Sequence, residues 1–169
     1  ANGADIIIAQ GLEAGGHRAM FLTEDVTSQV GTLALVPQIV EAVKVPVVAA
    51  GGIADAKGVA AVLKLGAVAA QVGTSYMLCP EATTTPLHRA AIQSPQAQHT
   101  ALTNIFTGRP ARGIINRIIK ELGPISSAPS QFPLAVSALL PLRTKAEARG
   151  MDDFTPLWCG QNAGGCREV

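Results

Sequence analysis

The sequence Pro46-Val-Val-Ala-Ala-Gly-Gly-Ile53 decides the fold of the first half of the chain. Its apolar residues do not alternate with polar ones, which is typical of a strand buried on both faces of a sheet. Similar runs occur before and after it, at Asp5-Ile-Ile-Ile-Ala9 and Ala67-Val-Ala-Ala-Gln-Val72. The sequence therefore predicts three buried strands in its first half.

Residues with helical spacing separate these strands. Leu33–Val43 carries apolar residues three or four positions apart, with Pro37 expected in the first turn. Asp55 is expected to cap a second helix over Ala56–Leu65, which Gly66 would end. Strands that alternate with helices in this way predict parallel β/α architecture with right-handed crossovers. Ligands of such sheets bind at the carboxyl ends of the strands, where the glycine-rich segments lie.

The second half of the chain has a different character. Pro80–Pro141 is rich in proline and polar residues and shows no strand pattern. Helices are expected around His88–Gln93, Gly113–Glu121 and Leu142–Arg149. The glycine-rich tail, Phe154–Val169, is expected to be loosely structured.

Composition and charge exclude several classes of protein. The chain has 169 residues, of which 48% are hydrophobic, and a formal net charge of +1. A disordered segment would carry more charge, and a nucleic-acid-binding protein would carry a basic surplus. The apolar runs are too short to cross a membrane, and no basic-then-apolar leader opens the sequence. We therefore expect a cytoplasmic protein with neither a nucleic acid nor a membrane as its partner.

The three cysteines do not form a recognisable framework. Cys79, Cys159 and Cys166 are odd in number and widely spread, and no pair has C-x-x-C spacing. Neither a set of disulfides nor a zinc knuckle is therefore predicted. This distribution favours a reducing compartment.

Glycines follow the second and third predicted strands. Gly51 and Gly52 end one strand, and Gly73 with Thr74 ends the next. Because glycine has no Cβ, a phosphate can approach its backbone N–H, and a helix N-terminus adds a favourable partial charge. In barrels, the loops after the last two strands often bind phosphate. Ordinary turn glycines would produce the same pattern, so spacing alone leaves both interpretations open.

A histidine occurs in the glycine-rich loop after the first strand. His17 ends the sequence Gln10-Gly-Leu-Glu-Ala-Gly-Gly-His17 and can serve as a general base near neutral pH. The alternative is a loop histidine exposed to solvent. Glu13 can orient the imidazole, but a solvated loop charge is the favoured interpretation. The amides of Gln10 and Gln71 can recognise a heteroaromatic ring or bond a loop carbonyl.

Two arginines lie in the Gly/Pro-punctuated stretch Thr103–Arg117. Arg109 and Arg112 can hold an anionic substrate or a phosphate. Arginines in such loops more often bond carbonyl groups or solvent, and this interpretation is favoured. His88 and His99 lack partners at metal-ligand spacing and are interpreted as surface or helix residues.

Five motifs, in order, resemble the FMN-dependent nitronate monooxygenases, formerly called 2-nitropropane dioxygenases. They are Ala9–His17, Pro46–Ile53, Gln71–Thr74, Thr103–Gly113 and Pro156–Gln161, the last two being similar to the class I branch. The resemblance covers nearly the whole chain. It implies an α/β fold: the C-terminal part of a TIM (β/α)8 barrel, with about three βα units, followed by a mostly helical substrate-domain segment. The implied division is 1–78 for the FMN-binding barrel units, 79–150 for the helical and loop segment of the substrate domain, and 151–169 for the tail.

The resemblance also implies an activity and a site. His17 would be the catalytic residue, either as the base that removes the α-proton of a neutral nitroalkane or as a polar partner of the nitronate. FMN would be the cofactor, bound by Gln10, Gly15, Gly16, Gly51, Gly52, Gln71, Val72, Gly73 and Thr74. The implied reaction oxidises alkyl nitronates with O₂ to a carbonyl compound and nitrite, without a metal.

The sequence departs from the family pattern in two ways. Ala19 stands where the family usually has glycine. A closed barrel also needs eight strands and about 250 residues, so the chain is expected to be the C-terminal half of the enzyme. Two alternatives to the nitronate monooxygenase remain: a related flavin reductase, of the NADH:quinone or enoyl-ACP reductase type, and a flavin-free fragment that acts as a binding module. The physiological substrate and the oligomeric state stay open.

Overall fold

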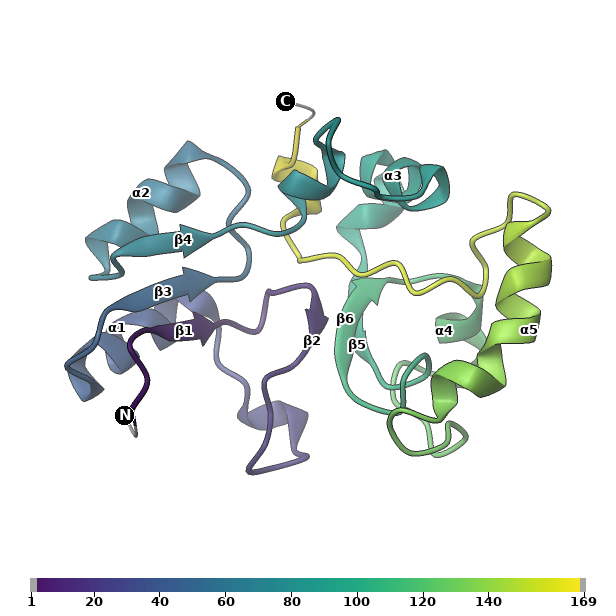
Figure 1. Cartoon of the computed structure of the whole chain (residues 1–169), viewed down its shortest axis with the longest axis horizontal. Helices are drawn as coiled ribbons and strands as arrows, with labels where there is room; N and C mark the ends of the chain where they lie inside the picture. The colour runs from purple at the N-terminus through teal and green to yellow at the C-terminus, as the bar shows by residue number, and fades with distance from the viewer. Residues whose placement is uncertain (1–2, 168–169) are drawn as a thin grey trace.

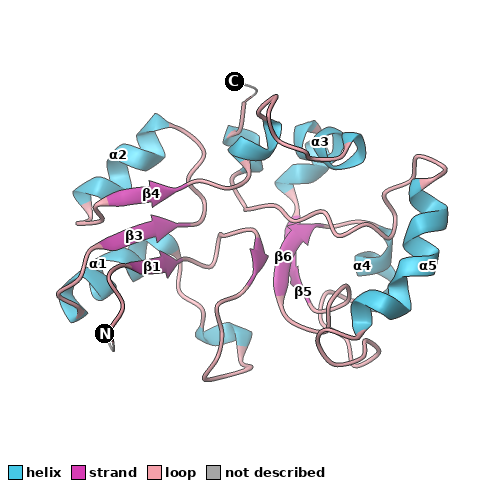
Figure 2. Ribbon diagram, in the orientation of Figure 1, coloured by secondary structure: helices cyan, strands magenta, loops and turns pink. Residues whose placement is uncertain are grey.

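A three-stranded parallel sheet forms the first half of the molecule. The computed structural model describes residues 3–167, and Figures 1 and 2 show the strands β1 (Ile7–Gln10), β3 (Val47–Ala50) and β4 (Ala69–Gln71). Their order is β1-β3-β4, and Ala50 is in register with Gln10 on one side and with Gln71 on the other. The predicted parallel β/α architecture is confirmed, and the carboxyl ends of all three strands meet at one edge.

The burial of these strands differs from the prediction. β3 is largely buried, because the other two strands flank it. Ile8 of β1, in contrast, is 54% exposed, and Val68 next to β4 is exposed as well. The expectation that each strand is buried on both faces is therefore wrong for β1 and β4, which lie at the two edges of the sheet.

Two helices share a core with the parallel sheet. They are α1 (Thr32–Ala42) and α2 (Ala56–Lys64), and Val36 and Val62 pack with the apolar residues of the strands. The Asp55 carboxylate caps α2 by accepting a 2.8 Å hydrogen bond from the backbone N–H of Gly58, as predicted. Pro37 lies in the second turn of α1 rather than the first, because the helix already begins at Thr32.

An antiparallel sheet forms the centre of the second half. Its order is β2-β6-β5, with β2 at Gly16–His17, β6 at Ala111–Ile114 and β5 at Thr100–Thr103. The expectation that Pro80–Pro141 contains no strand is therefore wrong. Both strands are only four residues long, and β6 is buried throughout, so neither shows the apolar–polar alternation of an ordinary strand.

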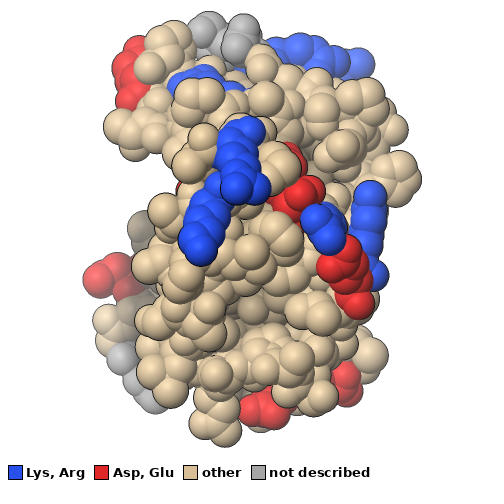
Figure 3. Space-filling view, turned by 90° about the vertical axis from the view of Figure 1, so that its right-hand side faces the viewer, with Lys and Arg blue, Asp and Glu red and all other residues tan. Residues whose placement is uncertain are grey.

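The remaining helices are shorter or lie in the second half of the chain. They are α3 (Pro86–Gln93), α4 (Arg117–Leu122) and α5 (Ala135–Glu147), together with four short 3₁₀ helices, η1 (Val26–Ser28), η2 (Ser75–Leu78), η3 (Pro95–Gln98) and η4 (Ala163–Gly165). The helix expected at Gly113–Glu121 begins only at Arg117, because its first residues belong to β6. Ion pairs four residues apart link successive turns in α4 and α5, and on the face shown in Figure 3 basic and acidic side chains lie close together.

The tail is ordered, contrary to the expectation for Phe154–Val169, of which residues 168 and 169 lie outside the described residues. It runs between the two halves of the molecule (Figure 1), and Trp158 forms an antiparallel bridge with Gly113 of β6. Leu157 is fully buried in a core that also contains Leu78 and Ile114. The glycines suggest a loose segment, but buried apolar residues, Leu157, Cys159 and Ala163, anchor it.

Replacing Leu157 with alanine tests how much the tail contributes to stability. We expect Leu157→Ala to lower the free energy of unfolding by about 2–5 kcal/mol, because it leaves a cavity in a closed core. The measurement is urea denaturation followed by circular dichroism. The matched control is Leu140→Ala in α5, whose side chain is 51% exposed and whose loss should cost within about 0.5 kcal/mol. Equal effects of the two variants would contradict an anchored tail.

Candidate active site

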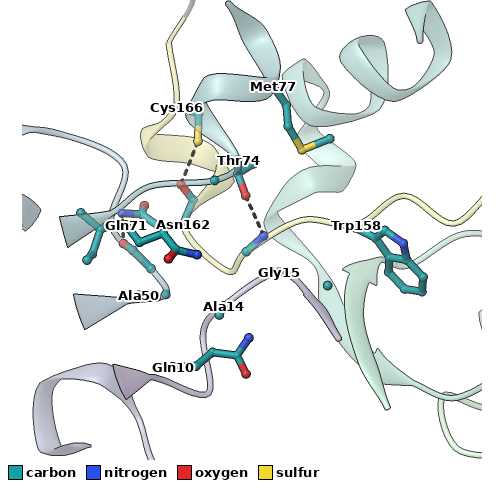
Figure 4. Close-up of a pocket in the computed structure, with 16 residues that line it drawn as sticks. Gln10, Ala14, Gly15, Ala50, Gln71, Thr74, Met77, Trp158, Asn162 and Cys166 are labelled. Carbon is teal, nitrogen blue, oxygen red and sulfur yellow. Dashed lines mark hydrogen bonds between the residues drawn. The ribbon is translucent and has the colours of Figure 1, made fainter. Parts of the chain in front are cut away.

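A pocket of about 250 Å³ lies at the carboxyl edge of the parallel sheet (Figure 4). All but one of the residues expected to bind the flavin line it: Gln10, Gly15, Gly16, Gly51, Gly52, Gln71, Gly73 and Thr74. Val72 does not, since its side chain packs against the core of the parallel sheet. The ends of three strands and the tail therefore line one pocket. The sequence predicts that the strand ends meet there, but it does not predict the contribution of the tail.

Close backbone approaches explain two of the glycines. Gly51 has a φ of +113°, and a Cβ on it would lie 2.9 Å from the backbone nitrogen of Ala14. A Cβ on Gly15 would lie 2.6 Å from the backbone nitrogen of Gly160. Gly73 differs, because a Cβ there would meet no atom within 4 Å. The first two glycines are required by packing, whereas Gly73 leaves free space at the pocket.

Two buried arginines hold the glycine-rich loop in place. Arg18, only 2% exposed, donates hydrogen bonds to the carbonyls of Gly11 (2.7 Å) and Ala14 (3.1 Å). Arg112, 4% exposed, reaches from β6 and donates from Nε to the carbonyl of Leu12 at 3.0 Å. Burial, with a further contribution from Arg112, lowers the pKa of Arg18 to about 10. Arg112 thus bonds a carbonyl, as the favoured interpretation predicts.

Glu13 is not a solvated loop charge. Its carboxylate accepts hydrogen bonds from the backbone N–H of Thr32, at 2.8 and 3.0 Å, and from the Thr32 hydroxyl at 2.8 Å. Thr32 is the first residue of α1, so the negative charge stabilises the N-terminal end of that helix. The sequence does not reveal this role, because the partner of Glu13 lies in another element of the fold. Since the carboxylate bonds Thr32, it does not orient the imidazole of His17.

The Gln10 amide stabilises the loop from its other end. Its Nε2 donates to the carbonyl of His17 at 3.1 Å, and its Oε1 accepts from the backbone N–H of Ala19 at 2.9 Å. Of the two alternatives for Gln10, the hydrogen bond to a loop carbonyl is the one that the structure contains. Gln71 lies across the pocket from it (Figure 4).

His17 stands beside the pocket rather than in its lining. Its ring lies 5.6 Å from the ring of Trp158, which lines the pocket, and 5.9 Å from the ring of Phe132. Its Nε2 is 2.9 Å from the Thr107 hydroxyl oxygen. Partial burial, with a further contribution from the positive charge of Arg109, lowers the pKa of His17. The imidazole is therefore neutral over a wider pH range than a free histidine.

The Arg109 side chain is half-buried beside His17. Its Nη2 donates to the carbonyl of Met20 at 2.8 Å, and its guanidinium carbon lies 4.9 Å from the ring centre of Phe21 and 5.9 Å from that of Phe132. Arg109, like Arg112, thus bonds a carbonyl. Because its charge lies close to the imidazole, it also acts on the protonation of His17.

The tail supplies the part of the pocket that reasoning from the strands misses. Trp158, Asn162 and Cys166 line it, and the Asn162 amide donates to the carbonyl of Gly52 at 2.9 Å. The backbone N–H of Gly160 donates to the Thr74 hydroxyl at 3.0 Å, as the dashed line in Figure 4 marks. Trp158 and Gly160 lie in the motif Pro156–Gln161, whose function the sequence alone does not reveal, whereas no motif marks Asn162 or Cys166.

His88, His99 and Cys159 lie outside the pocket lining. His88 lies in α3, as interpreted, and its Nε2 is 2.9 Å from the carbonyl of Trp158. His99 is exposed, directly after η3. Burial raises the pKa of Cys159 to about 12, which keeps this thiol protonated. Residues 3–167 contain no group of three or more potential metal ligands, and no helix among them is long and apolar enough to cross a membrane.

Comparison with known proteins now adds the family. The nitronate monooxygenase family model matches residues 1–169. The chain belongs to the nitronate monooxygenase family. It is 45% identical over 170 residues to the nitronate monooxygenase of Pseudomonas aeruginosa. The aligned region covers 100% of this chain and 48% of that protein. It is also 40% identical over 159 residues to a probable nitronate monooxygenase of Bacillus subtilis, covering 94% and 46%.

Two solved structures are also similar to this chain. Nitroalkane oxidase from Streptomyces ansochromogenes has a TM-score of 0.90 and 43% identity, covering 98% of this chain and 48% of that one. FabK from Thermotoga maritima has a TM-score of 0.75 and 30% identity, covering 99% and 50%. The chain spans about half the length of the curated relatives it matches. The nitronate monooxygenases are flavin-dependent oxidoreductases with a TIM-barrel fold.

The influence of Arg109 on His17 can be measured directly. We expect Arg109→Gln to raise the pKa of His17 toward its ordinary value, because a nearby positive charge no longer opposes protonation. The measurement is an NMR titration of the His17 ring signals. The control, Arg117→Gln, removes an arginine that pairs with Glu121 in α4 and should leave the titration unchanged. A pKa that stays constant in Arg109→Gln would exclude an electrostatic role for Arg109.

Proposed function

We propose that this protein catalyses the FMN-dependent oxidation of alkyl nitronates with O₂, yielding a carbonyl compound and nitrite. The observation that carries the proposal is the position of His17, whose pKa is lowered, directly beside a glycine-lined pocket at the carboxyl ends of parallel strands. Membership of the nitronate monooxygenase family supports the substrate class. Small molecules, a nitronate or nitroalkane and O₂, would be the partners.

The pocket fits a flavin phosphate at its glycine end. Gly51, Gly52 and Gly73 present backbone without side chains, and the space where a Cβ of Gly73 would lie is open. Such backbone lets phosphate oxygens approach N–H groups closely. We assign the phosphate to these residues and Thr74, and the ring end of FMN to Gln10, Gly15, Gly16 and Gln71; Val72 would contribute only its backbone. Bound FMN would supply the redox chemistry.

The chemistry of His17 follows from its protonation state. A neutral imidazole can accept the α-proton of a neutral nitroalkane, and the electron pair of the broken C–H bond then remains on the substrate as the nitronate. The lowered pKa keeps more of the imidazole in the proton-accepting form near neutral pH. A preformed nitronate has already lost this proton and does not need the base.

We further propose that the parallel sheet is the C-terminal part of a TIM barrel. Its strands β1 and β4 are edge strands, and the exposed Ile8 and Val68 provide apolar surface that further barrel strands would cover. In this proposal residues 1–78 form the barrel units, 79–150 the segment that covers the substrate, and 151–169 the tail that completes the pocket.

A flavin reductase is the second candidate, because FabK of Thermotoga maritima has a similar structure over 99% of the chain. Purified, FMN-loaded protein separates the two activities. We expect nitrite to form from an alkyl nitronate in the presence of O₂, and NADH to reduce the flavin only slowly in the absence of O₂. Rapid reduction by NADH without nitrite formation would establish the reductase and reject the oxygenase.

Substitution of Gly73 tests the phosphate assignment. We expect Gly73→Ala to weaken FMN binding by about tenfold or more, or about 1.4 kcal/mol, because the new methyl group would fill open space at the pocket. The measurement is titration of the apoprotein with FMN, followed by flavin fluorescence. The control is Gly164→Ala in η4, where a Cβ also meets no atom within 4 Å. Equal FMN affinity in the two variants would contradict the assignment.

Substitution of His17 tests its role as base. We expect His17→Asn to lower the turnover of a neutral nitroalkane much more, by about 10²-fold or greater, than the turnover of the corresponding preformed nitronate. The reason is that only the neutral substrate requires proton removal. Steady-state oxygen consumption with each substrate gives the two rates. Equal losses on both substrates would show that His17 is not the base.

A further inference from the structure

The Thr107 hydroxyl group connects His17 to the backbone of Arg109. Its oxygen lies 2.9 Å from His17 Nε2, 3.1 Å from the carbonyl oxygen of Arg109 and 3.3 Å from the backbone nitrogen of the same residue. Thr107 is buried, and its three contacts are partly buried, which limits competition from solvent. The hydroxyl group therefore has a fixed set of partners.

These partners determine the direction of each hydrogen bond. A hydroxyl group has a single proton to donate, and a carbonyl oxygen can only accept, so the Thr107 proton points to the carbonyl of Arg109. The hydroxyl oxygen is then an acceptor toward both nitrogen atoms. In this arrangement His17 Nε2 carries the proton and donates it to the Thr107 oxygen. Within residues 3–167, His17 Nδ1 has no hydrogen-bond partner.

We propose that Thr107 is a positioning residue that holds neutral His17 as the Nε2–H tautomer, so that Nδ1 is the atom that accepts the substrate proton. The catalytic part of this inference rests on the proposed function, whereas the tautomer does not. The rings of Trp158 and Phe132 pack against the imidazole and restrict its rotation. Hydrogen bond and packing together determine which nitrogen atom is available.

The local sequence builds this arrangement at Thr107-Gly108-Arg109. Gly108 has a φ of +81°, which turns the chain so that the carbonyl of Arg109 faces the Thr107 hydroxyl. A Cβ on Gly108 would collide with the backbone of Ser130 and of Phe132, whose ring packs on His17. This turn therefore places both the hydroxyl group and one of the two neighbouring rings.

The same contact suits the protonated state that follows. When Nδ1 accepts a proton, the positive charge spreads over the ring, and the existing Nε2–H bond to Thr107 becomes charge-assisted and stronger. No group has to rotate, because Nε2 is already the donor. Partial burial of the ring and the positive charge of Arg109 both oppose this protonation.

Replacing Thr107 with valine removes the hydroxyl group while keeping the shape. In ¹⁵N NMR spectra of the FMN-loaded protein at about pH 8, we expect wild-type His17 to have protonated Nε2 and unprotonated Nδ1. In Thr107→Val the tautomer should shift toward Nδ1–H, because Nε2–H would face a methyl group without an acceptor. Thr107→Ser should keep the wild-type spectrum. Thr103→Val, at a buried threonine that bonds the backbone of Ile105, is the control for folding.

Kinetics test the catalytic part of the inference. We expect Thr107→Val to lower kcat/KM for a neutral nitroalkane about fivefold, roughly the effect of one lost hydrogen bond, and to lower kcat/KM for the preformed nitronate by a clearly smaller factor. Thr107→Ser should restore the rate with the nitroalkane. A wild-type spectrum with Nδ1–H, or a Thr107→Val protein with unchanged tautomer and unchanged rate ratio, would overturn the inference. A wild-type protein that has the expected tautomer but oxidises neither substrate would refute the proposed function and leave the tautomer established.

Discussion

The loop Gln10–Arg18 connects the two sheets, and the rest of the structure depends on its path. Two buried guanidinium groups fix that path. Arg18 bonds the carbonyls of the loop from within, whereas Arg112 bonds it from β6. Burying two positive charges close together is costly, because both lose hydration and they repel each other. Every carbonyl that moved away would leave part of a buried charge without a partner. The conformation of the loop is therefore stabilised by the free-energy penalty of leaving a buried guanidinium group unpaired.

The fixed path of this loop explains how the pocket arises. The chain leaves the parallel sheet at β1, turns through Glu13 and joins the antiparallel sheet as β2, so that the pocket lies where the two sheets meet. The tail then packs over the loop, with the backbone N–H of Gln161 donating to the carbonyl of Glu13 at 2.9 Å. His17 ends the loop and is thereby placed beside the pocket. The path of the loop therefore determines both the position of the imidazole and the shape of the pocket.

Local signals suffice for the parallel half of the fold but not for the antiparallel half. The run Pro46–Ala50 and the Asp55 cap predict β3 and α2 because their information lies within a few residues. β6 contains Arg112, whose burial depends on partners outside the strand: the carbonyl of Leu12, far away in sequence, and the Thr100 hydroxyl both accept from it. In the site, glycines and His17 are recognisable from the sequence. Trp158 lies in a recognisable motif, but only the fold shows that it reaches the strand ends.

The stretch Thr107–Arg109 acts on His17 through two separate sets of atoms. The backbone of Arg109 orients the Thr107 hydroxyl, which bears on which nitrogen of the imidazole is protonated, whereas the Arg109 side chain bears on how easily the ring is protonated at all. A general base needs both properties, since a neutral imidazole with the wrong nitrogen exposed accepts no proton from the substrate. Because different atoms of Arg109 carry the two effects, we expect a substitution of its side chain to change the pKa of His17 more than its tautomer. The two effects can thus be varied separately.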